Sequence, residues 1–191
     1  MKTWISALTI VCGMGAGSAS VAIAQEKPAT PKPAATAGMD DKKTAKPGAD
    51  SAFMRTAAMD GMAEVDHGRL AVQNAESSDV KQFAQRMVDD HGKANSELKS
   101  LASQKSVTLP TELDAKHKAM HDKLSKLSGA GFDKAYMSHM VTAHKEAVAL
   151  FEREAKNGTD AEAKSFAEKT LPTLREHLKM AQDVSQRANK K

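Results

Sequence analysis

One glutamate and three histidines are each the single titratable residue in an otherwise apolar stripe: Glu64, His91, His144 and His177. Such a stripe, with apolar or small residues every three or four positions, is typical of the inner face of a helix. Imidazole and carboxylate groups are usual protein ligands of Zn, Fe, Mn and Cu ions. The pattern therefore predicts a site for one transition-metal ion. The alternative is a metal-free network of hydrogen bonds between Glu64 and the histidines, because buried polar groups must be paired.

Four long helices are needed to bring these side chains into one interior. The stripes predict two helical hairpins, over residues 52–101 and 132–184, with turns near residues 77–78 and 158–159. A shorter helix, over roughly residues 111–127, occupies the long connection between the hairpins. Two hairpins joined by one long crossover form the topology of ferritin-like bundles. We therefore predict an all-α, ferritin-like four-helix bundle with an additional short helix in the crossover; a loose five-helix array is the alternative.

The heights of the four residues in the bundle follow from counting along each helix. Glu64 lies about 13 residues before the first turn and His91 about 13 after it, so at 1.5 Å per residue both are roughly 20 Å from it. His144 lies about 14 residues before the second turn and His177 about 18 after it. The counts predict that Glu64 and His91 are level. They place His177 nearly one helical turn away from the level of His144, and a kink at Pro172 would alter this offset.

Iron–oxygen chemistry is a weaker interpretation of the same bundle. Carboxylate-bridged di-iron bundles take a glutamate from each of two helices and a Glu-x-x-His motif from each of the other two. The first helix alone has such a motif, Glu64-x-x-His67, and three residues before the other inner histidines stand Val88, Val141 and Leu174. The bridging carboxylates of a ferroxidase or an oxygenase are therefore missing from the pattern.

Methionine and histidine segments suggest copper binding as a second hypothesis, because soft thioether ligands and imidazoles suit copper. The candidate segments are Met59-x-x-Met62, His117-x-x-Met120-His121 and Met137-Ser138-His139-Met140. Methionine is also a common gap-filler in helical cores. In that alternative interpretation the methionines are core residues, and His117, His121 and His139 lie on solvated helix faces.

The composition excludes several classes of protein. The 191 residues are 40% hydrophobic but only 4% aromatic, and good helix formers fill the chain, which argues against a sheet-rich fold. A net charge of +4, evenly spread, is not the clustered basic surface of a nucleic-acid-binding protein. The sequence has neither a phosphate-binding loop nor a nucleophile elbow. We therefore expect a binding protein rather than an enzyme, with a Zn, Fe, Mn or Cu ion as its candidate cofactor.

The N-terminal segment predicts export. Lys2 precedes an apolar stretch over residues 4–12, and Ala22-Ile23-Ala24 is a small-x-small cleavage site, so residues 1–24 are predicted to be a signal peptide. The apolar stretch is too short to span a membrane, and Cys12 within it lacks the sequence context of a lipidated cysteine. Residues 25–50, rich in Pro, Ala and Lys, are predicted to be a disordered linker, and residues 51–188 the helical domain. We expect a periplasmic or otherwise exported protein whose mature chain has no membrane-spanning segment.

Four runs of residues resemble one family of bacterial envelope proteins. The runs are Phe53…Ala57-Ala58…Gly61…Glu64-Val65…Gly68-Arg69-Leu70-Ala71, Val80-Lys81-Gln82-Phe83-Ala84…Met87-Val88-Asp89-Asp90-His91, Phe132-Asp133…Tyr136…Val141…His144 and Leu171-Pro172…Leu174…His177-Leu178…Ala181. They cover about residues 51–184 and resemble the family known as domain of unknown function 4142. The resemblance implies an exported, ferritin-like helical domain, often assigned to the outer membrane, with an envelope protein as its partner. It implies no reaction, and a link to envelope stress rests on this analogy alone.

Overall fold

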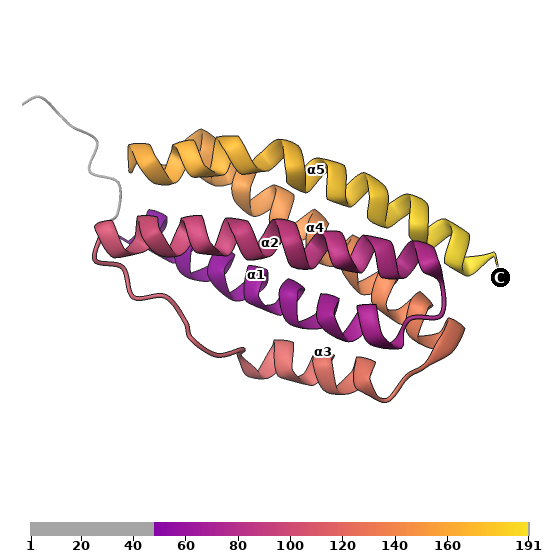
Figure 1. The fold of residues 1–191 in the computed structure, drawn as a ribbon. Coiled ribbons are helices and arrows are strands. Elements are labelled where there is room, and N and C mark those ends of the chain that lie inside the picture. The colour runs from indigo at the N-terminus through magenta and orange to yellow at the C-terminus, as the bar shows by residue number, and fades with distance from the viewer. Residues whose placement is uncertain (1–47, 191) are drawn as a thin grey trace, which may run out of the picture. The chain divides into compact units, whose positions relative to one another are not determined.

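The computed structural model describes residues 48–190, and within them the chain forms five helices and no strand. The helices are α1 (Ala49–Asn74), α2 (Ser78–Gln104), α3 (Ala115–Ser125), α4 (Gly129–Asn157) and α5 (Ala161–Asn189). Helix α1 packs along α2 and α4 along α5, and the two hairpins meet through α1 against α4 and α2 against α5 (Figure 1). The predicted all-α bundle of two hairpins is confirmed.

The predicted N-terminal boundaries fall mostly outside the described part of the chain. The predicted signal peptide (1–24) and the predicted linker up to residue 47 lie outside the described residues. Helix α1 begins at Ala49, two residues before the predicted start of the helical domain. In its first turn, the Asp50 carboxylate accepts hydrogen bonds from the backbone N–H and the hydroxyl of Thr159, at 2.9 and 2.6 Å. Within residues 48–190, no helix is long and apolar enough to cross a bilayer.

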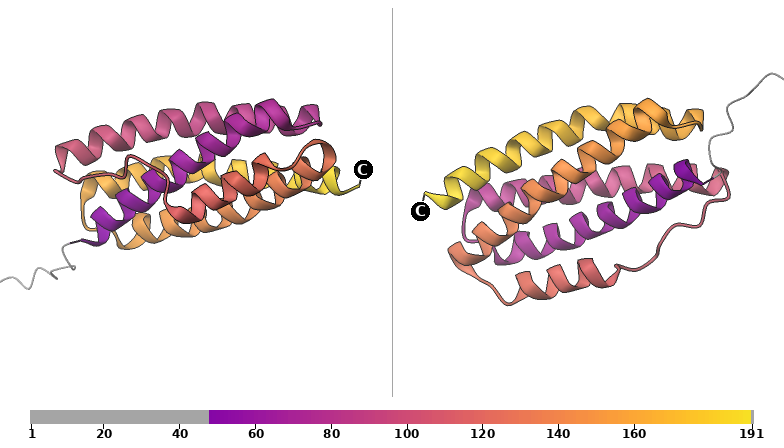
Figure 2. Two further views of the ribbon diagram at one scale, coloured as in Figure 1. Left: turned by 90° about the horizontal axis from the view of Figure 1, so that it is seen from below. Right: turned by 180° about the vertical axis from the view of Figure 1, so that it is seen from behind.

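The short helix α3 lies in the connection between the hairpins and packs against α1 and α4 (Figure 2). It begins at Ala115, four residues later than the sequence pattern predicts. Asp114 then caps the helix, because its carboxylate accepts a hydrogen bond from the backbone N–H of His117 at 2.9 Å.

Two clusters of buried apolar side chains form the core. One contains the aromatic group Phe53, Phe151 and Phe166, with ring centroids 5.0–6.5 Å apart. The other contains Phe132 and Tyr136, whose rings stack at 5.9 Å. Each of the four long helices contributes residues to the first cluster from one part of its length and to the second from another. In each helix, the single titratable residue of the inner stripe lies between these two parts.

Candidate metal centre

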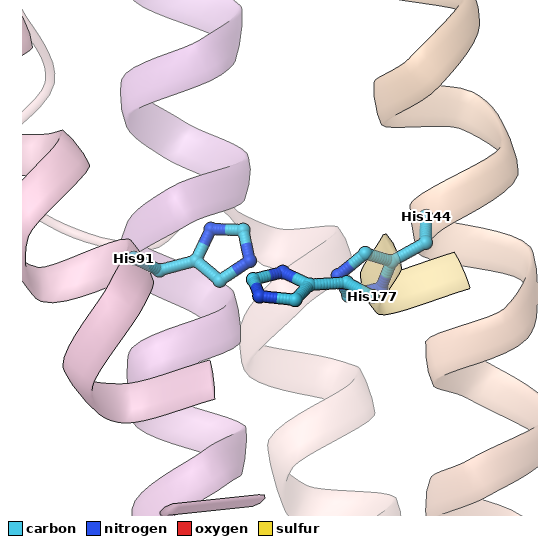
Figure 3. Close-up of side chains that lie close together, drawn as sticks. All are labelled: His91, His144 and His177. Atoms are coloured by element: carbon cyan, nitrogen blue, oxygen red, sulfur yellow. The ribbon is translucent and has the colours of Figure 1, made fainter. Parts of the chain in front are cut away.

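The four residues between the apolar clusters form what we term the polar layer: Glu64, His91, His144 and His177. Their exposed fractions are 4%, 7%, 0% and 1%, respectively. The three imidazole rings converge from α2, α4 and α5, with ring centroids 5.3–5.5 Å apart (Figure 3). One nitrogen from each ring lies within 4.8 Å of the corresponding nitrogens of the other two. The structure thus brings the three histidines together, although counting placed His177 nearly one turn off.

Glu64 of α1 contacts two of these rings. Its carboxylate oxygens lie 2.8 Å from Nδ1 of His91 and 3.5 Å from Nδ1 of His144. The same nitrogen of His144 also lies 3.0 Å from the backbone carbonyl of Met140, to which it donates. Glu64 therefore accepts a hydrogen bond from His91 and determines which nitrogen of that ring carries the proton.

Asp90 is a member of the site that the inner-stripe pattern missed. Its carboxylate accepts a hydrogen bond from Nε2 of His177 at 2.8 Å and pairs with Arg86 at 3.2 Å. Asp90 immediately precedes His91, and consecutive helical residues point about 100° apart, so it cannot lie on the same stripe. Its side chain is 36% exposed and reaches the buried ring from the surface. An acidic residue next to an inner histidine was the signal that could have revealed it.

Three ring nitrogens of the layer have no hydrogen-bond partner among the described residues: Nε2 of His91, Nε2 of His144 and Nδ1 of His177. In each ring, a carboxylate or a backbone carbonyl already engages the other nitrogen. Leaving a buried polar atom unpaired costs about 1–3 kcal/mol. Three free nitrogens on converging rings form a donor set that one metal ion would satisfy.

The ionisation states of the layer depend on one another. Burial raises the pKa of Glu64, but the charges of His91 and His144 and the hydrogen bond from His91 outweigh it and lower that pKa to about 2. Burial lowers the pKa of His91, but attraction to Glu64 reverses this effect and raises it. Burial lowers the pKa of His177 to about 4 despite its hydrogen bond to Asp90. At neutral pH, His177 is therefore a neutral ring, which is the form that binds metal.

The family model of a domain of unknown function, DUF4142, matches residues 31–184. The chain belongs to the DUF4142 family. Among curated proteins, none matches this DUF4142 chain.

Solved structures of other proteins share the fold of the DUF4142 domain. A DUF305 fragment from Deinococcus radiodurans has a TM-score of 0.65 at 14% identity, over 73% of this chain and 96% of that one. A DUF305 protein from Streptomyces coelicolor, described as secreted, has a TM-score of 0.63 at 13% identity, over 74% and 94%. CopM in its Cu(II)-bound form has a TM-score of 0.62 at 19% identity, over 72% and 96%. At these identities the similarity establishes the helical-bundle fold alone.

The four other histidines of the DUF4142 domain gather where α1, α3 and α4 meet: His67, His117, His121 and His139. His67 is fully buried, with Nε2 3.3 Å from the carbonyl of His117 and Nδ1 3.3 Å from Nε2 of His139. His117 is 9% exposed and His139 is half-buried. The prediction that His117 lies on a solvated face is wrong, because α3 packs against α1 and α4 and buries this side chain, whereas His121 and His139 are partly exposed.

The methionines that suggested copper binding have different surroundings. Met137 and Met140 are fully buried in the second apolar cluster, as the gap-filling interpretation predicts. The sulfur of Met59 accepts the backbone N–H of Asp114 at 3.4 Å. Among residues 48–190, the three histidines of the polar layer are the only group of three or more histidine, aspartate or glutamate side chains that converges closely enough to hold an ion.

Proposed function

We propose that this protein is an exported helical domain that binds one transition-metal ion through His91, His144 and His177. The observation that carries the proposal is the set of three free ring nitrogens on converging rings. Glu64, one of the four residues from the sequence pattern, contacts Nδ1 of His91 and His144, so its role is that of a hydrogen-bond acceptor. Asp90 has the same role toward His177. Such carboxylates fix the orientation of metal-binding rings and raise their basicity.

A metal-free polar network is the competing interpretation, in which the domain is a scaffold that acts through its surface. That network satisfies one nitrogen per ring and leaves three buried ring nitrogens without a partner, at about 1–3 kcal/mol each. One ion would satisfy all three at once. Ligands about 2.1 Å from a tetrahedral ion lie roughly 3.4 Å apart. One nitrogen of each ring lies within 4.8 Å of those of the other two, so three ligating nitrogens would need to approach by little more than 1 Å.

Zinc and copper fit this donor set better than manganese or iron. Imidazole nitrogens suit Zn and Cu ions, whereas Mn favours carboxylate oxygens. A di-iron centre needs carboxylate bridges, and the converging group consists of histidines. The similar fold of CopM, whose structure is of a Cu(II)-bound form, is a further reason to test copper first alongside zinc.

We infer metal binding rather than catalysis because the interior has room for an ion but not for a substrate. The cavity beside the layer, lined by Glu64, His91 and Phe151 among others, has a volume of about 20 Å³. A volume of this size holds about one water molecule, whereas small-molecule pockets measure about 300–1,000 Å³. An ion bound by the three rings would be enclosed by protein.

Equilibrium dialysis of untagged protein against Zn²⁺, Cu²⁺, Fe²⁺ and Mn²⁺, followed by elemental analysis, tests the proposal. We expect one Zn or Cu ion per chain in the wild type and its loss in His91→Ala, His144→Ala and His177→Ala. His121→Ala, which removes a histidine outside the layer, is the matched control and should retain the ion. Bound metal should also stabilise the wild type by about 2.7 kcal/mol at a concentration of 100 Kd. An ion-free wild type would favour the metal-free scaffold, and equal metal content in all variants would mean that the ion binds outside the polar layer.

We also propose that the domain acts outside the cytoplasm, with a protein of the bacterial envelope as its partner. The signal-peptide pattern of residues 1–24 supports export, and so does the fold shared with a DUF305 protein described as secreted. N-terminal sequencing of periplasmic protein should then begin at Gln25. Recovery of an uncleaved chain from the membrane fraction would contradict this.

A further inference from the structure

A cavity of about 170 Å³ lies between α1, α3 and α4, beside the group of four histidines. Its lining offers imidazole nitrogens, carboxylate oxygens and a thioether sulfur. They belong to His117, His139, Asp60, Glu146 and Met120. Imidazole and thioether ligands favour Zn and Cu ions. The cavity also contacts Glu64, so it extends from the surface to the polar layer.

Two carboxylates connect this cavity to the interior. Asp60 and Glu64 line both the outer cavity and the interior cavity of about 20 Å³ beside His91. They are four residues apart on α1, so their side chains lie one turn apart on the same helix face. A cation in the outer cavity would therefore meet Asp60 and then Glu64 on its way to His91.

The hydrogen bonds of His139 leave one of its nitrogens free for a ligand. The carbonyl of His117 can only accept, so Nε2 of His67, 3.3 Å away, donates to it. Nδ1 of His67 then accepts a hydrogen bond from Nε2 of His139, also at 3.3 Å. Nδ1 of His139 consequently carries a lone pair. Burial, together with the charge of His67, lowers the pKa of His139 to about 4, so the ring is neutral at neutral pH.

Asp60 supplies negative charge to the cavity. Burial and the adjacent charge of Glu64 raise the pKa of Asp60 to about 6, although His117 and Lys116 act in the opposite direction. An oxygen of Asp60 lies 3.5 Å from Nε2 of His117. Because this carboxylate is incompletely compensated when ionised, a bound cation would stabilise it and displace its proton.

We propose that this cavity is a transfer site for the metal ion: Asp60 and His139 bind the incoming divalent cation, and Glu64 passes it to the interior histidines. The inference rests on the proposed function, because it assigns the route by which the interior site is filled. The interior rings are at most 7% exposed, so an ion needs such a route. Helix α3, which the ion pair between His121 and Asp66 holds against α1, forms the outer wall of this route.

The rate at which metal-free protein takes up Co²⁺ tests the transfer site, because the visible absorption of Co²⁺ changes when histidines coordinate it. Asp60→Asn should slow uptake by about tenfold or more, the scale of electrostatic steering into charged clefts. His139→Ala should also slow uptake, because it removes a ligand of the transfer site. The final amount of bound Co²⁺ should equal that of the wild type. Asp122→Asn is the matched control, because Asp122 is an exposed carboxylate of α3 that does not line the cavity, and this variant should load at the wild-type rate.

Each outcome has a distinct meaning. Uptake at the wild-type rate in Asp60→Asn and His139→Ala would overturn the transfer site while leaving the interior site intact. Loss of equilibrium binding in these variants would also overturn it, because both residues would then belong to the final site. If the wild type binds none of Co²⁺, Zn²⁺ and Cu²⁺, the proposed function fails and the transfer site fails with it. Circular dichroism checks that each variant is folded, and His139→Gln, which keeps a donor near His67, replaces His139→Ala if that variant unfolds.

Discussion

Replacing Glu64 by alanine tests the polar layer without any metal present. The carboxylate accepts a hydrogen bond from Nδ1 of His91 at 2.8 Å, and Nε2 of the same ring already lacks a partner. In Glu64→Ala, His91 becomes a buried ring in which neither nitrogen has a hydrogen-bond partner. His144 is affected less, because its Nδ1 keeps the carbonyl of Met140 at 3.0 Å. The substitution therefore creates one new orphaned donor in the interior.

The expected cost follows from that single donor. An orphaned buried donor costs about 1–3 kcal/mol, and the space left by the side chain adds a smaller cavity contribution. Since 1 kcal/mol shifts the melting temperature of a domain of this size by about 4 °C, we expect a decrease of about 4–12 °C. Glu64→Gln is the matched control, because its amide oxygen still accepts from His91 and should restore most of the stability. Urea denaturation followed by circular dichroism, in the presence of a chelator, measures both variants.

Two results would refute this reasoning. A free energy of unfolding for Glu64→Ala within about 0.5 kcal/mol of wild type, the usual range of neutral surface changes, would mean that His91 needs no acceptor. Equal losses in Glu64→Ala and Glu64→Gln would mean that the charge matters rather than the acceptor. With metal present, Glu64→Ala should weaken binding by about 10–100-fold, the usual cost of removing a carboxylate that orients a metal-binding histidine.

Three further substitutions test the surrounding bundle. Burial, with the hydrogen bond and charge of Asp50, raises the pKa of Glu154 from 4.5 to about 7, so the folded state loses stability as pH rises through this range. The gain in melting temperature from Glu154→Gln should therefore be larger at pH 8 than at pH 5. Asp160→Ala removes the cap of α5 and should cost about 0.5–2 kcal/mol in urea denaturation. Gly68→Val puts a Cβ 3.0 Å from Cγ2 of Val88 on α2, and overpacking should lower the free energy of unfolding by about 1–3 kcal/mol.

The helices and the convergence of the three histidines could be predicted because the rules behind them are local. Apolar spacing identifies the inner face of each helix, and a short turn brings two helices of a hairpin to known heights. Counting residues from the second hairpin turn nevertheless placed His177 nearly one helical turn away from the level of His144. In the structure, the apolar residues of α5 on both sides of His177 pack into the two clusters, and this packing determines its height.

Asp90 and the histidines around α3 could not be predicted in the same way. Periodicity indicates which face of a helix is inside, but not which neighbour covers its other faces. His117 is buried because α3 packs against α1, and the path of the chain between α2 and α3 is irregular and carries no periodicity. Asp90 reaches His177 across the α2–α5 contact, which depends on how the two hairpins meet.

The polar layer draws its histidines from both halves of the chain: His91 belongs to α2, and His144 and His177 belong to α4 and α5. An ion bound there would be a reversible cross-link between the two hairpins. Tying residue 91 to residue 144 closes a loop of about 53 residues and so removes conformational freedom from any state in which the hairpins separate. Metal-loaded protein should therefore open as one cooperative unit, whereas the hairpins of the metal-free protein can part independently.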